Sequence, residues 1–215
     1  MTDSIKITKF GHCCMLYECD GVRVLIDPGS YSSSQNNVEN VHVILVTHKH
    51  QDHLHIESIE TILKNNPKAR VITNKSVGKL LTEKRINFEI LEEGKFTMEA
   101  SVGIEACGHN HAVIYSSLPA VENTGFFLTG GFYFPGDSFN TPEKKVEILA
   151  LPVAGPWMKL SEAIDFAKEL KPKICFPVHE GILKFLGPVH KVPEQELSKV
   201  GIQFVVIKDN ETKEF

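Results

Sequence analysis

The chain contains 215 residues, with 23 basic and 27 acidic side chains and a formal net charge of −4. A chain of this length most simply forms one domain, residues 1–215, with a substantial buried core. The balanced charge provides no basic footprint for nucleic acid, and no apolar run is long enough to span a membrane. We therefore expect one domain that binds neither nucleic acid nor a membrane. The sequence does not indicate an oligomeric state.

The cysteines and the N-terminus favour a reduced, cytoplasmic setting. Five cysteines, an odd number without a Cys-x-x-Cys pair, occur at positions 13, 14, 19, 107 and 175. Such usage is typical of reducing compartments. The first residues lead directly into an alternating pattern and lack the features of a signal peptide. Cys13 and Cys14 could form a reactive pair, but buried small hydrophobic side chains are the simpler interpretation.

Apolar patterning predicts strands and helices along the whole chain, with no linker to divide it. Strands are expected at 5–7, 14–18, 22–26, 41–46, 70–73, 88–91, 102–106, 146–153, 174–178 and 204–207, and a hairpin at 126–134. Helices are expected from about 54–56 to 63, and at 77–84, 161–170 and 193–200. Two strand-rich halves interrupted by helices favour the α+β class, as a four-layer αββα sandwich with two sheets face to face and helices outside.

Turn and cap signals mark the ends of several of these elements. The polar segment 31–40 is expected to be a loop. Gly130-Gly131 is predicted to be the two-residue turn of the hairpin, and 92–94 a turn between the strands on either side. Ser161 is a suitable N-cap for the helix that follows, because its hydroxyl can accept a hydrogen bond from a free backbone N–H.

The most informative segment is Thr47-His48-Lys49-His50-Gln51-Asp52-His53. It follows an apolar strand and precedes a helix, so its polar side chains lie in a strand-to-helix turn, where α/β sheets place their sites. His48 and His50, two residues apart, can reach one metal ion from the same side of an extended turn. The adjacent Asp52 and His53 point differently and could serve a second ion. Imidazole and carboxylate together suit zinc, iron or manganese better than magnesium or calcium.

Further candidate ligands lie just past other predicted strands. Either His109 or His111 could complete a three-imidazole set for the first ion. Asp27 and Asp137 each follow an apolar strand, and a turn residue is the simple interpretation of both. His179 follows the strand at 174–178 in the same way. Three other histidines, at 42, 55 and 190, are expected to be structural or exposed.

The segment 47–53 resembles the His-x-His-x-Asp-His signature of the metallo-β-lactamase superfamily. The Gly-His at 11–12 and the residues after it are similar to the opening of its lactonase-like branch of metal-dependent hydrolases. The resemblance extends from Gly11 to Gly181 and implies the four-layer αββα sandwich of that superfamily.

The resemblance also assigns the more distant positions. The run that starts His111-Ala112-Val113-Ile114 matches a subgroup pattern, which favours His111 over His109 as the third ligand of the first ion. Asp137 matches an aspartate whose carboxylate bridges two metal ions, and a carboxylate has two oxygens to offer. His179 matches the final histidine, a ligand of the second ion.

Two other residues gain expected roles near the metal ions from the same resemblance. Asp27 corresponds to an aspartate that supports the metal-binding histidines, and such a partner fixes the tautomer of a ligand. His12 is expected to line the pocket without binding a metal ion.

The resemblance implies a metal-dependent hydrolase with a small-molecule substrate. His48, His50 and His111 would hold one ion and Asp52, His53 and His179 another, with Asp137 between them. Two divalent ions are expected, zinc first, with manganese or iron as alternatives. A metal-bound hydroxide would then cleave a small ester such as a lactone or phosphodiester, with Asp52 orienting the nucleophile or moving its proton.

Other chemistries have less support. The sequence contains no Gly-x-Ser-x-Gly elbow and no P-loop, which disfavours serine acyl transfer and nucleotide cradling. The alternatives are an iron-dependent oxidoreductase on the same fold and a catalytically silent member that binds a metal or ligand. Competent side chains at all seven ligand positions argue against silence.

Overall fold

The structure, a computed structural model, describes residues 4–215. Residues 1–3, part of the segment judged to lack signal-peptide features, lie outside the described residues. The strands form two sheets of seven strands each. The first has the order β14-β1-β2-β3-β4-β5-β6, built from Thr212–Glu214, Lys6–Gly11, Cys14–Cys19, Val22–Ile26, Val43–Leu45, Arg70–Thr73 and Glu89–Ile90.

The second sheet has the order β13-β12-β11-β10-β9-β8-β7. Its strands are Gln203–Phe204, Ile174–Val178, Ile148–Pro152, Phe132–Phe134, Gly125–Leu128, Val102–Cys107 and Phe96–Glu99. Each sheet has an antiparallel part and a parallel part: β3 to β6 are parallel in the first, and β10 to β13 are parallel in the second.

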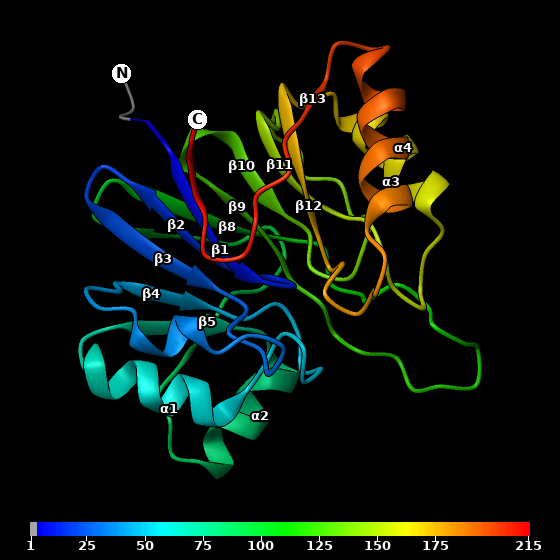
Figure 1. Cartoon of the computed structure of the whole chain (residues 1–215). Coiled ribbons are helices and arrows are strands. Elements are labelled where there is room, and N and C mark those ends of the chain that lie inside the picture. The colour runs from blue at the N-terminus through cyan, green and yellow to red at the C-terminus, as the bar shows by residue number, and fades with distance from the viewer. Residues whose placement is uncertain (1–3) are drawn as a thin grey trace.

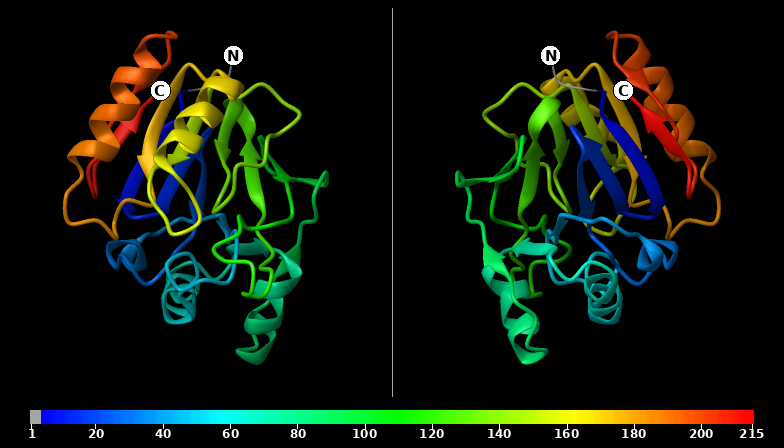
Figure 2. Two further views of the ribbon diagram at one scale, coloured as in Figure 1. Left: turned by 90° about the vertical axis from the view of Figure 1, so that its right-hand side faces the viewer. Right: turned by 90° about the vertical axis from the view of Figure 1, so that its left-hand side faces the viewer.

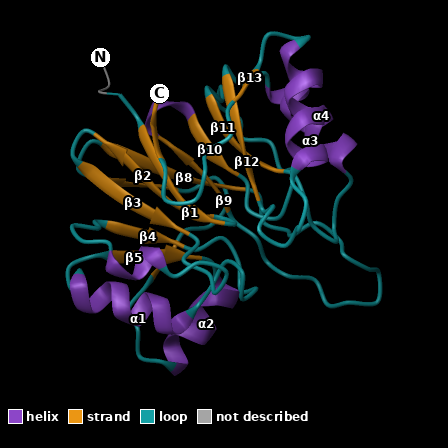
Figure 3. Cartoon of the chain, in the orientation of Figure 1, coloured by secondary structure: helices purple, strands orange, loops and turns teal. Residues whose placement is uncertain are grey.

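Four α-helices cover the outer faces of the two sheets. They are α1 (Ile56–Asn65), α2 (Lys75–Glu83), α3 (Leu160–Leu170) and α4 (Gly187–Ser198), and two short 3-10 turns lie at Ser34–Asn37 and Thr129–Gly131. Figures 1 and 2 show α1 and α2 on one side of the paired sheets and α3 and α4 on the other. Figure 3 shows the strands as the inner layers. The predicted four-layer αββα sandwich is confirmed.

Alternating side chains divide the interior into three apolar layers. In β3, Val24 and Ile26 face the core between the sheets, whereas Leu25 packs under α1 and α2. In β11, Ala150 faces the central core and Leu149 packs under α3 and α4. Successive side chains of a strand point to opposite faces, and both faces here are covered, so these strands are apolar apart from Arg23 near the start of β3.

The ends of two helices differ from the predictions. The N-cap of α3 is Lys159, whose backbone N–H donates to Glu162 Oε2 at 2.7 Å, so Ser161 lies inside the first turn and its predicted role as N-cap is wrong. α4 begins at Gly187, with a proline at its first turn, six residues before the predicted start. His190 therefore lies in α4 and not in a loop.

Some strands were also missed or misjudged. β7 and β14 are edge strands that the apolar pattern does not predict, and the strand expected at 204–207 is the two-residue β13. The hairpin of β9 and β10 is confirmed, but its turn spans the three residues Thr129–Gly131. Gly130 and Gly131 both have positive φ there, a conformation that glycine adopts at no steric cost.

The cysteines are buried and free of disulfides. Cys13 faces the central core and Cys14 the layer under α1, as the interpretation of small hydrophobic side chains expects. Burial raises the pKa of Cys13 to about 12, which disfavours a reactive thiolate. No helix within residues 4–215 is both long and apolar enough to cross a membrane.

Candidate metal centre

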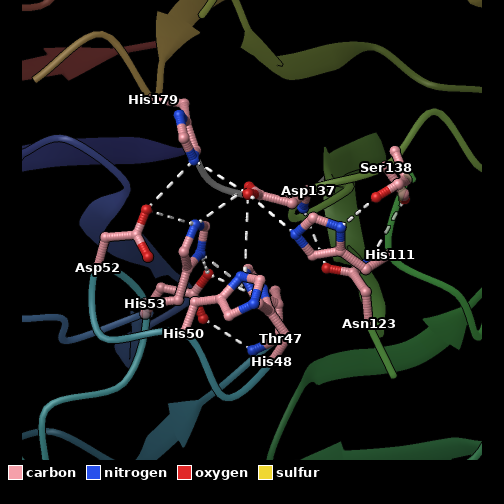
Figure 4. Close-up of polar contacts among 12 residues, drawn as sticks. Thr47, His48, His50, Asp52, His53, His111, Asn123, Asp137, Ser138 and His179 are labelled. Carbon is pink, nitrogen blue, oxygen red and sulfur yellow. Dashed lines mark hydrogen bonds and ion pairs between the residues drawn. The ribbon is translucent and has the colours of Figure 1, made fainter. Parts of the chain in front are cut away.

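The seven predicted ligands converge at one edge of the sandwich, as Figure 4 shows for the labelled side chains. Parallel strands end at the same edge of a sheet, which is where such folds place their sites. The turn after β4 carries His48 to His53, the turn after β10 carries Asp137 and the turn after β12 carries His179. His111 comes from the loop between β8 and β9. Both sheets therefore contribute to one cluster.

Two groups of side chains offer metal ligands, and Asp137 belongs to both. The first group adds His48, His50 and His111, and the second adds Asp52, His53 and His179. Within each group the ligand atoms lie within 4.8 Å of one another. This arrangement coincides with the predicted grouping around two ions, and the assignment of each ligand stays a prediction.

The carboxylate of Asp137 occupies the centre of the cluster (Figure 4). Its Oδ2 lies 3.0 Å from His179 Nε2 and 3.3 Å from His111 Nε2. The same oxygen lies 3.9 Å from His48 Nε2, and Oδ1 lies 3.1 Å from His53 Nε2. One carboxylate thus reaches imidazoles of both groups, which is the geometry a bridging ligand needs.

The charge states of Asp137 and His48 suit cation binding. Burial raises the pKa of the Asp137 carboxyl, but His53, His111 and His179 outweigh it and hold this pKa well below the usual range. Burial has the opposite effect on an imidazole and lowers the pKa of His48 well below its ordinary value. An ionised carboxylate and a neutral imidazole are the forms that bind a metal ion.

Several buried polar atoms at the centre lack a well-aligned hydrogen bond. They are His53 Nε2 and Asp137 Oδ1, which are 3.1 Å apart without making one, and His111 Nε2. A buried polar atom left without a partner costs about 1–3 kcal/mol, and native structures contain few of them. Divalent cations coordinated by this donor set would satisfy all three atoms, so the residues present fit a metal centre.

Asp27 holds His53 from the end of β3. The carboxylate is fully buried, and its Oδ2 accepts a hydrogen bond from His53 Nδ1 at 2.6 Å and from Thr47 Oγ1 at 2.7 Å. Its Oδ1 accepts from the Thr47 backbone N–H at 2.8 Å. A proton held on Nδ1 leaves Nε2 of the ring free to bind a metal ion. The geometry accords with the supporting role expected for Asp27.

Asn123 performs a similar task for Asp137, and sequence reasoning gave it no role. Its Oδ1 accepts a hydrogen bond from the Asp137 backbone N–H at 3.0 Å, and its Nδ2 donates to the Pro135 carbonyl at 2.8 Å. Gly136 adopts a φ of +64°, and a Cβ there would lie 2.2 Å from Asn123 Oδ1. The only sequence feature that could have indicated this role is Asn123 in the Asn-Thr-Gly segment, because the groups that Asn123 contacts are distant in sequence.

Asp52 is the more accessible of the two carboxylates in the second group. Its side chain is 16% exposed, against 4% for Asp137, and it lines a cleft of about 410 Å³. Its Oδ2 lies 3.2 Å from His12 Nε2 and 3.4 Å from His179 Nε2. Burial raises the pKa of Asp52, but these two histidines outweigh it and hold the pKa below the usual range.

His12 lies deeper than expected. It is buried behind Asp52 and, with Cys13, His53 and His179, forms a third group of ligand-type side chains that the sequence did not indicate. His109, by contrast, is exposed and belongs to none of the three groups. His42, His55 and His190 are half-buried and outside all three groups, as predicted.

Fold and donor set together define a class, the metal-binding αββα sandwich proteins, and comparisons with known proteins identify the family. The model of the beta-lactamase superfamily domain matches residues 6–179. Protein Rv0786c of Mycobacterium tuberculosis is 32% identical over 83% of this chain and 85% of its own. The chain belongs to the beta-lactamase superfamily.

Two further comparisons bear on the activity class and the fold. The UPF0173 metal-dependent hydrolase NEQ378 of Nanoarchaeum equitans is 26% identical over 96% of this chain and 98% of its own. The crystal structure of the metallo-beta-lactamase fold protein YhfI of Bacillus subtilis superposes with a TM-score of 0.73 at 13% identity, covering 99% of this chain and 100% of that one. The predicted superfamily, fold and enzyme class, a metal-dependent hydrolase, are confirmed.

The choice between two neighbouring histidines gives a direct test of the first group. We expect His111→Ala to lower bound metal by about one ion per chain, because His111 Nε2 is a buried, unpaired ligand atom. The matched control His109→Ala removes an exposed imidazole and should leave the metal content unchanged. Elemental analysis of both variants, with total protein, measures this. Metal loss in His109→Ala alone would reassign the ligand.

Metal affinity should depend on pH through His179. Burial lowers the pKa of this imidazole, but its contacts with Asp137 and Asp52 raise it to about 9. In the metal-free protein it is therefore protonated at neutral pH, and a metal ion must displace that proton. We expect affinity to rise as the pH approaches 9 and to weaken below it. Calorimetric titration in two buffers of different ionisation enthalpy should reveal proton release, and its absence would contradict the raised pKa.

Proposed function

We propose that this metal-dependent hydrolase holds two divalent ions, zinc in the first instance, and cleaves a small ester such as a lactone or phosphodiester. The supporting observation is the Asp137 carboxylate, which approaches imidazoles of both ligand groups within 3.9 Å. His48, His50 and His111 would hold one ion and Asp52, His53 and His179 the other. Two ions held by a shared carboxylate typically lie ~3.5–4 Å apart.

The bound ions would supply an activated water, with its pKa lowered from ~15.7 towards ~7, and would polarise the attacked group. The chain contributes rigid placement of these ligands. Asp27 orients His53, and Asn123 fixes the backbone of Asp137. Neither supporting group is exposed to solvent, so neither has water as a competing partner.

Asp52 is the residue best placed to handle the proton of the attacking water. It lines the cleft, and its low pKa keeps it ionised at neutral pH, so it can accept a hydrogen bond from a water or orient it. His12 Nε2 donates a hydrogen bond to the Asp52 carboxylate at 3.2 Å and thereby restricts the rotation of the carboxylate. We assign Asp52 the catalytic role and His12 a positioning role.

Removal of the metal and replacement of Asp52 test this proposal together. Metal-free protein should be inactive on a panel of lactones and aryl esters and should recover with zinc or manganese. Asp52→Asn should lower kcat by about 10²-fold, the lower end of the contribution of general acid–base groups. The control Asp165→Asn alters an exposed carboxylate on α3 and should retain full activity. Hydrolysis that persists without any metal would contradict the proposal, and turnover of a redox substrate with iron alone would favour the oxidoreductase alternative.

A further inference from the structure

The cleft over the metal centre has walls that are largely apolar. Apart from the ligands themselves, its lining is formed chiefly by Tyr31, Ile114, Pro156, Trp157 and Ile182. Substrate pockets typically combine an apolar lining with a few polar groups that fix orientation. In this cleft the polar groups are the metal ligands, Gln51 and the hydroxyl of Tyr31, and the other lining residues are apolar.

A larger cavity adjoins the cleft. We name it the loop hollow; it has a volume of about 700 Å³ and is lined by Lys49, His50 and residues 110–116 and 118–121. His50 and Ile114 line both the cleft and the loop hollow, so the two meet at the metal centre. Figure 1 shows the loop between β8 and β9 that carries these residues, in green, extending away from the two sheets.

The loop hollow presents unusually exposed apolar side chains. Val113 is 72% exposed, Tyr115 67% and Leu118 54%. Single exposed apolar residues are ordinary, but several on one segment that borders a site indicate a surface that is covered during function. Their position beside His50 and His111 points to an occupant that also reaches the metal centre.

Lysine and arginine are sparse around both cavities. Neither residue type lines the cleft, where His179 is the protonated group of the metal-free protein, and Lys49 is the one lysine or arginine that lines the loop hollow. Proteins usually recognise phosphate and carboxylate groups with arginine forks, lysines or backbone nests. An anionic substituent in the loop hollow would therefore have one lysine to meet its charge, whereas an alkyl substituent would cover exposed apolar surface.

We infer that the substrate is an uncharged ester or lactone with an apolar substituent, which binds in the loop hollow while the scissile carbonyl faces the metal centre. This inference rests on the proposed hydrolysis and deepens it by naming the kind of substituent that the substrate carries. It assigns Val113 and Leu118 to substrate specificity.

The test is a chain-length series with the zinc-loaded protein. For γ-lactones with alkyl substituents from methyl to octyl, kcat/KM should rise by up to about fourfold for each methylene that becomes buried. Hydrolysis of bis(p-nitrophenyl) phosphate at the same metal loading reports the metal centre independently of alkyl length. A flat lactone series alongside such hydrolysis would overturn the inference and leave metal-dependent hydrolysis intact.

A binding measurement separates recognition from turnover. Trp157, the sole tryptophan of the chain, lines the cleft, so its fluorescence should report ligand entry in the metal-free protein. Affinity for 2-alkylcyclopentanones, which cannot be hydrolysed, should rise with chain length as the lactone series does. A rising ketone series without hydrolysis of any substrate would overturn the proposed function alone, whereas a flat ketone series would overturn the inference.

Matched variants show whether the loop hollow causes the dependence on chain length. Val113→Ser combined with Leu118→Ser should flatten both chain-length series, whereas Val200→Ser, at an exposed valine that lines neither cavity, should preserve them. Sedimentation of the same variants identifies a competing role for the loop. A changed oligomeric state with unaltered chain-length series would make the loop an interface between copies of this chain and would overturn the inference.

Discussion

The structure depends on one buried anion, the carboxylate of Asp137. Its side chain is only 4% exposed and lies among four imidazoles drawn from both sheets. A buried charge costs several kcal/mol unless it is compensated, and in the metal-free protein the protonated His179, 3.0 Å away, compensates it. A metal ion that displaces this proton would take over the same role, and the proposed hydrolysis follows from what such ions do to water.

Maintaining that centre constrains the backbone around it. His12, Asp27 and His179 all adopt positive φ, at 49°, 46° and 68°. Such conformations cost about 1–3 kcal/mol each for residues other than glycine and persist only where the surrounding structure enforces them. The enforcement is visible here, because the His179 N–H donates to the His12 carbonyl across the two sheets and the Asp27 side chain is locked by Thr47. The packing of the apolar layers offsets the free-energy cost of this backbone strain, and the strained residues place the ligands.

The sequence predicts the local features well and the distant ones less well. His48 to His53 lie in one short turn, so their spacing alone indicates a metal site, whereas Asp137 and His179 needed the resemblance because tertiary structure unites them. The prediction of Ser161 as N-cap is wrong because Glu162 accepts a hydrogen bond from the Lys159 backbone N–H at the start of the helix, a contact independent of the N-cap side chain. The edge strands β7 and β14 are not predicted from the sequence because their side chains are largely exposed and lack an apolar pattern. The role of Asn123 lies wholly in contacts that form on folding.

Electron paramagnetic resonance of the manganese-loaded protein distinguishes two ions joined by Asp137 from two separate ions. Two Mn²⁺ ions bridged by a carboxylate at ~3.5–4 Å are spin-coupled. We expect a multiline spectrum of a coupled pair in the wild-type protein and its replacement by the six-line signal of isolated ions in Asp137→Ala. A six-line signal from the wild-type protein at full loading would contradict a shared carboxylate and leave separate, unbridged ions.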